Sequence, residues 1–145
     1  MVIAASQKLY TLSAGTPQLT IRLKAENKVS ENTGKYLVAF SGAHLEQMPD
    51  GAYEVYLSNK EVAVNITTSS SPYFTGVIDT YMLHSGTASQ SIFLDVSEKI
   101  NDKVVNIEPE TIITIIFRGN LGTNGSASAD AGRLLLTRVS LLKIN

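Results

Sequence analysis

The chain has 145 residues, of which 43% are hydrophobic, so it is long and apolar enough to bury the core of one domain, and disorder throughout is excluded. Twelve basic and 13 acidic side chains give a formal net charge of −1 and occur without blocks, which argues against a nucleic-acid partner and a polybasic membrane patch. Cysteine is absent, which excludes disulfides, thiol nucleophiles and thiolate metal sites.

Neither a leader nor a membrane span is predicted. Residues 1–8 lack the basic start and apolar core of a signal peptide. No run approaches the roughly 20 apolar residues that a spanning helix needs. We therefore expect one soluble domain over residues 1–145, in which residues 1–16 serve as a linker or an edge strand.

The first predicted strands flank a polar loop. Residues 9–12 form a short strand that is broken by the Gly and Pro at positions 15 and 17. Residues 18–25 alternate between apolar and polar side chains, which is typical of an antiparallel strand with one face in solvent. Residues 26–35 are polar and form a loop.

Two strands follow in the middle of the chain. Residues 36–41 are an apolar run and predict a strand, and residues 42–50 predict a connection with turn chemistry at its end. Residues 53–58 then alternate cleanly, with apolar side chains at the odd positions and Glu54, Tyr56 and Ser58 at the even ones. This period predicts a half-buried strand at the centre of the sheet, with the even positions facing solvent.

The third quarter of the chain predicts three strands and a short helix. Residues 61–67 indicate a short strand, and residues 73–83 a longer one that bulges at its glycine. Residues 91–94 form a strand that leads into a helix. Asp95 and Glu98 have the spacing of a capping box, so one or two helical turns should follow and end near residue 102.

The C-terminal part completes an all-β pattern. Residues 111–117 are the most strand-prone segment and should be buried on both faces, whereas residues 119–132 are small and form a loop. Residues 133–144 predict a last strand with a bulge, at which the apolar side chains change from one set of alternate positions to the other. About eight strands and one short helix predict an antiparallel β-sandwich or a jelly-roll-like barrel.

No catalytic constellation is evident. His44 and His84 lie 40 positions apart without the spacing of zinc ligands, and we interpret both as loop histidines. No G-x-S-x-G nucleophile elbow occurs. The glycine-rich residues 119–125 lack the lysine of a P-loop. An enzyme is therefore not expected.

Four tyrosines leave two interpretations open. Together they could form an aromatic platform for sugars, or they could pack in the core with their hydroxyls at its rim. We favour packing in the core. The four are Tyr36, Tyr53, Tyr56 and Tyr73.

The order of these segments resembles a known β-domain. Residues 51–58 read Gly-Ala-Tyr-Glu-Val-Tyr-Leu-Ser, residues 73–76 read Tyr-Phe-Thr-Gly, and residues 92–98 read Ile-Phe-Leu-Asp-Val-Ser-Glu. With the closing strand near residue 139, they are similar in order to the C-terminal β-domain of the type-3 copper proteins, which include polyphenol oxidases, tyrosinases and molluscan haemocyanins. The resemblance spans about residues 17–142. Tyr53 and Glu54 stand where the family has phenylalanine and aspartate.

The resemblance implies an accessory role. In that family six histidines on a separate helical domain hold the copper, so this chain resembles the β-domain alone and should carry no cofactor. The family's β-domain covers the copper pocket and inserts a bulky loop side chain, which keeps the enzyme latent. The implied partner is a tyrosinase-like dicopper catalytic domain, in cis or in trans.

The corresponding loop here is residues 80–86. Leu83 is the candidate plug, with Met82 and Tyr81 as alternatives and His84 beside them. The other interpretation is that these residues finish a strand and pack in the core.

Two further functions stay open for the same architecture. One is a carbohydrate- or surface-binding module. The other is a structural domain that self-associates through exposed edges such as residues 111–117. The sequence does not decide the oligomeric state.

Overall fold

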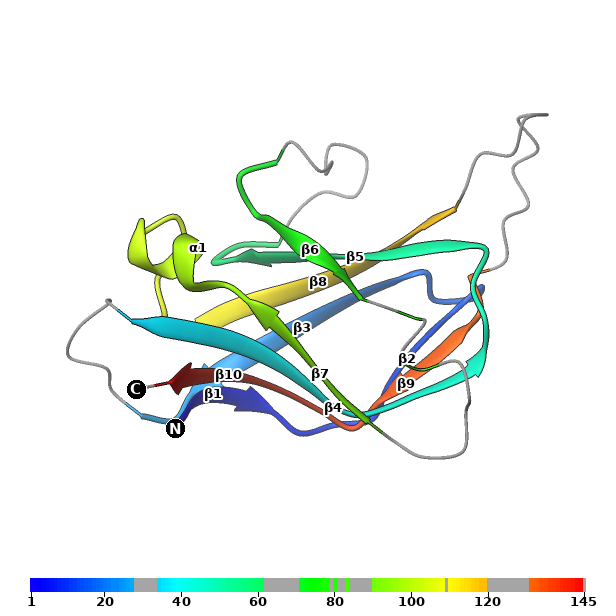
Figure 1. The fold of residues 1–145 in the computed structure, drawn as a ribbon, viewed down its shortest axis with the longest axis horizontal. Coiled ribbons are helices and arrows are strands. Elements are labelled where there is room, and N and C mark those ends of the chain that lie inside the picture. The colour runs from blue at the N-terminus through cyan, green and yellow to red at the C-terminus, as the bar shows by residue number, and fades with distance from the viewer. Residues whose placement is uncertain are drawn as a thin grey trace.

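The computed structural model describes residues 1–27, 34–61, 71–78, 80, 83, 90–108, 110–119 and 131–144. Within these residues the chain forms ten strands and one helix (Figure 1). The elements are β1 (Val2–Ser6), β2 (Tyr10–Ser13), β3 (Gln18–Ala25), β4 (Lys35–Gln47), β5 (Gly51–Ser58), β6 (Phe74–Ile78), β7 (Gln90–Asp95), α1 (Ser97–Asn101), β8 (Glu110–Gly119), β9 (Arg133–Leu136) and β10 (Arg138–Ile144). The strand expected at 61–67 falls almost entirely outside the described residues.

The strands form one curled antiparallel sheet in the order β2-β9-β4-β10-β1-β3-β8-β5-β6, with β7 paired to β4. The all-β class is therefore confirmed, with ten described strands where the sequence predicted about eight. The sheet is not a closed barrel. An added Cβ on Gly76 of β6 would lie 3.7 Å from the Leu94 side chain of β7, yet no ladder joins these strands among the described residues.

The long strand β4 bends and changes partners. Its first half pairs with β10 and β7, and its second half pairs with β9. The bend lies at Gly42, whose φ is +62°, opposite Thr137 in the break between β9 and β10. The Thr137 N–H donates to the Ser41 carbonyl oxygen at 3.0 Å and holds the two breaks together.

At this bend the buried side chains change from even to odd positions, so the predicted change of the apolar positions near the C-terminus is confirmed. Leu134 and Leu136 are buried before Thr137, and Val139 and Leu141 are buried after it. The prediction that residues 42–50 form only a connection is wrong. β4 continues to Gln47 because Ala43, on the far side of the bend, packs in the core.

The two ends of the chain lie side by side (Figure 1). β1 pairs with β10 on one side and with β3 on the other, and its Ile3 and Ala4 are fully buried. The Met1 ammonium donates to the Lys143 carbonyl oxygen at 3.0 Å. Residues 2–6 thus lie inside the sheet, whereas β2 occupies its edge.

The predicted central strand has the expected core face, but its other face is not in solvent. Tyr53, Val55 and Leu57 are at most 1% exposed, as the alternation predicts. Tyr56, on the opposite face, is also buried, because it lies beside Thr114 of β8 and its ring packs edge-on against Phe74 at 5.6 Å. The prediction that the even positions face solvent is therefore wrong for Tyr56 and Ser58.

The neighbouring strand β8 is buried on both faces, as predicted. Its residues from 111 to 116 are all at most 2% exposed. It pairs with β3 and β5, so it is internal to the sheet. The expectation that residues 111–117 offer an edge for self-association is wrong.

The helix begins without the predicted capping box. Its N-cap is Val96, and no side chain caps it. The Asp95 carboxylate instead accepts a hydrogen bond from the Ser97 N–H at 2.9 Å, and its hydrogen bonds from Ser97 lower the pKa of Asp95. Asp95 is the last residue of β7, so its backbone is extended and the helix starts one residue later.

Candidate functional site

The structure describes one of the four plug candidates, Leu83, together with Thr80 of the same loop. Leu83 is 4% exposed and belongs to the main hydrophobic cluster, and its N–H donates to the Thr80 carbonyl oxygen at 3.0 Å. Tyr81, Met82 and His84 lie outside the described residues. The role of this loop as a plug stays a prediction.

The histidine that the structure describes does not lie in a loop. His44 is within β4, opposite Leu135 of β9, and is partly exposed. Its expected loop position is wrong because β4 runs past the bend at Gly42. Across the described ranges, no three His, Asp or Glu side chains gather as metal ligands. No helix in this part of the chain is long and apolar enough to span a membrane.

The tyrosines do not form a platform for sugars. Tyr36, Tyr53 and Tyr56 are fully buried, and Tyr73 is partly buried against the core. The Tyr53 hydroxyl donates to the buried carbonyl oxygen of Ala131 at 2.6 Å. The favoured interpretation, core packing, is therefore confirmed for Tyr36 and Tyr53, whereas Tyr56 is buried on the opposite face of β5.

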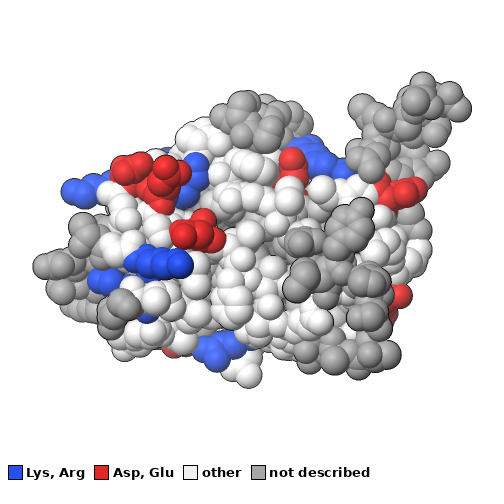
Figure 2. Space-filling model, viewed as in Figure 1, with Lys and Arg blue, Asp and Glu red and all other residues white. Residues whose placement is uncertain are grey.

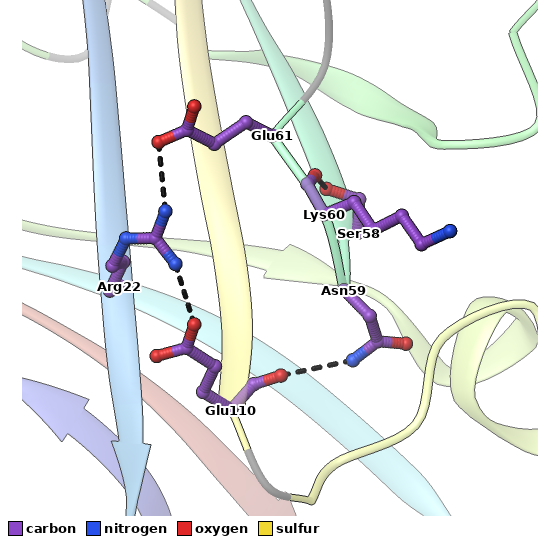
Figure 3. Close-up of polar contacts among 6 residues, drawn as sticks. All are labelled: Arg22, Ser58, Asn59, Lys60, Glu61 and Glu110. Carbon is purple, nitrogen blue, oxygen red and sulfur yellow. Dashed lines mark hydrogen bonds and ion pairs between the residues drawn. The ribbon is translucent and has the colours of Figure 1, made fainter.

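A charged cluster joins three segments on the outer face of the sheet (Figure 3). Arg22 of β3 donates to Glu110 of β8 at 2.6 Å and to Glu61 at 2.8 Å. The hydrogen bonds to Glu61 and then to Glu110 raise the pKa of Arg22. The Arg22 side chain is 49% exposed, so this cluster aligns strands rather than adding much stability.

Asn59, at the end of β5, makes three hydrogen bonds to the backbone near the start of β8. Its amide nitrogen donates to the carbonyl oxygens of Asn106 at 2.6 Å and Glu110 at 3.0 Å (Figure 3 shows the latter). Its amide oxygen accepts from the Asn106 N–H at 2.8 Å. One side chain therefore completes the backbone hydrogen bonding of this corner.

Replacing Asn59 by alanine should lower the free energy of unfolding by about 1–2 kcal/mol, because three backbone groups lose their partner. Chemical denaturation with matched slopes measures it. The control is Lys60→Ala, next in the chain and exposed, which should change stability by less than about 0.5 kcal/mol. Equal effects of the two substitutions would contradict this role of Asn59.

A second polar cluster lies on the same outer face. The Glu54 carboxylate accepts from Arg118 Nε at 2.8 Å and from the Tyr56 hydroxyl at 3.0 Å. The Glu54 side chain is only 16% exposed, so the ion pair is partly desolvated. Burial, and then the hydrogen bond to Glu54, raise the pKa of Tyr56, against the opposing effect of Arg118. Sequence reasoning missed this cluster because residues 54 and 118 meet only through the β5–β8 register.

The raised pKa of Tyr56 predicts a loss of stability in alkali. A group whose pKa is higher in the folded protein stabilises it fully below the unfolded pKa, here near 10, and loses that contribution as the pH rises through the folded pKa. The wild type should therefore lose stability relative to Tyr56→Phe above pH about 10. Unfolding curves of both proteins between neutral pH and pH about 11 measure the difference, and parallel pH profiles would contradict it.

These observations define an all-β domain built from one curled antiparallel sheet, without a cluster of His, Asp and Glu metal ligands among its described residues. No family model matches the sequence, and no curated protein matches it. Solved structures do match the fold. Recombinantly expressed latent aurone synthase, a polyphenol oxidase, superposes with a TM-score of 0.58 at 13% identity over 94% of this chain. The same enzyme co-crystallised with hexatungstotellurate(VI) gives 0.56 at 14% identity over 94%. Latent aurone synthase from its natural source gives 0.53 at 14% over 89%.

The match covers only part of those proteins. This chain spans 26% of the recombinant aurone synthase chain and 25% of the natural one. The similarity of fold that the order of segments predicted is therefore confirmed, and it is consistent with a C-terminal domain.

Proposed function

We propose that this chain is a non-catalytic shielding domain that covers the copper-site entrance of a tyrosinase-like dicopper enzyme. The observation that supports it is the coverage of the fold match, 94% of this chain but 26% of a polyphenol oxidase described as latent. A fold that makes up one quarter of a longer enzyme fits an accessory part that acts on the remainder. Such a domain needs no cofactor of its own.

The proposed mechanism is steric. An apolar side chain from the loop at residues 80–86 enters the substrate pocket and displaces water and phenol without adding a metal ligand. Leu83 is the first candidate, and its burial requires that it leave the domain's own core to reach the pocket. If Leu83 instead anchors the loop, Met82 or Tyr81 takes the role of the plug.

The test combines the chain with its dicopper catalytic domain, fused or mixed, and measures the rate of phenol oxidation. We expect the chain to slow oxidation, and we expect truncation of the plug residue to restore it. Leu83→Ala, Met82→Ala and Tyr81→Ala are compared one at a time. An unchanged rate on adding the chain would contradict the shielding role.

The control separates plugging from a general loosening of the domain. Leu136→Ala removes the same number of atoms from a fully buried leucine on β9. Both leucine truncations should lower the free energy of unfolding by about 2–5 kcal/mol. Only the plug variant should raise the oxidation rate at temperatures where both domains are folded. Equal activation by Leu136→Ala would show that loosening, not plugging, controls activity.

A further inference from the structure

Three adjacent strands are apolar on both faces although the core covers only one. β7 contains Ile92-Phe93-Leu94, β4 contains residues 36–40, and β10 contains Val139 and residues 141–142. A strand with one face in solvent normally alternates between apolar and polar residues, and continuous apolar runs are typical of strands that are covered on both faces. These runs therefore indicate a second covering layer.

The register places the outward residues of these strands side by side. Phe93 lies opposite Ala39, and Ala39 lies opposite Ser140. One row along, Leu37 lies opposite Leu142. We call this surface the β7–β4–β10 face. It consists of Leu37, Ala39, Phe93, Ser140, Leu142 and Ile144.

The described part of the chain leaves the larger side chains of this face exposed in part. Phe93 is 54% exposed and Ile144 is 39% exposed, Leu37 and Leu142 are partly exposed, and the small residues Ala39 and Ser140 are 4% exposed between larger neighbours. The outward residues of β8 provide the comparison within the same sheet. Ile112 and Ile116 are at most 2% exposed, so neighbouring parts of the chain bury these two outward side chains.

Among the described residues, charges lie at the margins of the face, and they are of both signs. Lys35 and Asp95 stand at one end and Arg138 stands at the other, as the pairing of β4 with β7 and β10 places them. Figure 2 shows an area without charged side chains in the middle of the view, with acidic and basic groups towards α1 and further charged groups at its other margins. An apolar centre with a mixed charged rim is typical of an interface between proteins and not of a surface for an anionic polymer.

We propose that the β7–β4–β10 face packs against an apolar surface of the catalytic domain. This inference rests on the proposed function and specifies which side of the sheet makes the contact. The choice of occupant follows from the comparisons, in which the same fold is one quarter of a longer chain whose other three quarters can cover it.

The absence of cysteine from the sequence allows a direct test. Phe93→Cys places one thiol on the face, and Thr20→Cys places one on exposed, outward-facing Thr20 of β3 as the matched control. The rate of alkylation by a maleimide is measured for the chain alone and for the chain with the catalytic domain. In the complex the thiol of the Phe93→Cys variant should react about tenfold more slowly, and the thiol of the Thr20→Cys variant should react at its free rate.

The pattern of protection from alkylation tests both the assigned face and the shielding role. Protection at position 20 but not at position 93 would overturn the assignment of this face and leave the shielding role intact. No protection at either position, together with unslowed phenol oxidation, would contradict the shielding role itself. Protection of position 93 in the chain alone, reversed on dilution in sedimentation, would show that a second copy covers the face and would overturn the proposal.

A second variant tests the face without labelling. Phe93→Glu puts a charge on the β7 side of the face, next to Ala39 of β4, and should leave the fold of the isolated chain unchanged, since the side chain is half exposed. It should weaken binding of the catalytic domain by about tenfold or more, because docking would bury an unpaired carboxylate. Thr20→Glu should have no such effect. Unchanged affinity for Phe93→Glu would overturn the proposal.

Discussion

Replacing Gly42 by alanine should lower the free energy of unfolding by about 2–4 kcal/mol, the largest effect expected from adding a single methyl group at the bend of the sheet. Gly42 has φ +62°, a conformation that residues with a Cβ adopt at a cost. The added Cβ would also overlap the Thr137 hydroxyl and lie 3.0 Å from the Thr137 Cβ. Relief of this overlap would break the hydrogen bond from Thr137 to Ser41 that joins the two strand breaks.

Two comparisons isolate the cause. Gly15→Ala adds the same methyl group where nothing lies within 4 Å, so it should change stability by less than about 0.5 kcal/mol. Thr137→Gly removes the opposing side chain, so Gly42→Ala should cost less in that background. Additive effects of the two substitutions in thermal or denaturant unfolding would show that the overlap is not the cause.

Gly132→Ala should be at least as damaging, with a loss of about 3 kcal/mol or more, because the new methyl group would meet backbone rather than a flexible side chain. Its Cβ would lie 2.5 Å from the Gln47 carbonyl oxygen and 2.7 Å from the Pro49 nitrogen, and its φ is +65°. Relief would require the segments on both sides to separate. The neighbouring Ala131 carbonyl would then move away from the buried Tyr53 hydroxyl.

The hydrogen bond between Tyr53 and Ala131 provides an independent measurement of this separation. Tyr53→Phe removes only the hydroxyl, and it should cost about 1–2 kcal/mol if the bond to Ala131 is intact. In a Gly132→Ala background the same substitution should cost much less. An unchanged cost of Tyr53→Phe would mean that Gly132→Ala leaves this contact in place, contrary to the expected separation.

Local periodicity accounts for much of the fold. The alternation at residues 53–58 correctly identified the core face of β5, and the predicted mid-strand switch of the apolar face within residues 133–144 is confirmed, although the chain forms two strands there, β9 and β10, rather than one. Each is a property of one short segment of the sequence. Periodicity could not show that Tyr56 is buried, because its neighbours Thr114 and Phe74 come from strands that only the register brings beside it.

The errors in element boundaries have a related cause. Gly42 suggested the end of a strand, yet β4 bends there and continues to Gln47, because Ala43 packs in the core and β9 pairs with its second half. Val2–Ser6 is too short and too small in its side chains to stand out as a strand alone. It becomes one because β10 and β3 supply partners on both sides.

The polar clusters could not be predicted from the sequence, because only the pairing of strands brings their residues together. Arg22, Glu61 and Glu110 are far apart in the sequence and meet only because β8 pairs with β3 on one side and with β5 on the other. The plug loop could be proposed only from the family resemblance, since an apolar residue in a loop carries no chemical motif. The structure describes Leu83 as a buried member of the main hydrophobic cluster, and its role as a plug stays a prediction.

The pairing of β1 with β10 has a consequence for how the domain forms. β10 lies between β1 and β4, so strands from opposite ends of this sequence meet in the interior of the sheet. Contacts of such high contact order make folding slow, since a long loop must close before they form. Until β10 is in place, the strand that joins β1 to β4 is missing, and the partly formed sheet exposes apolar residues that favour aggregation.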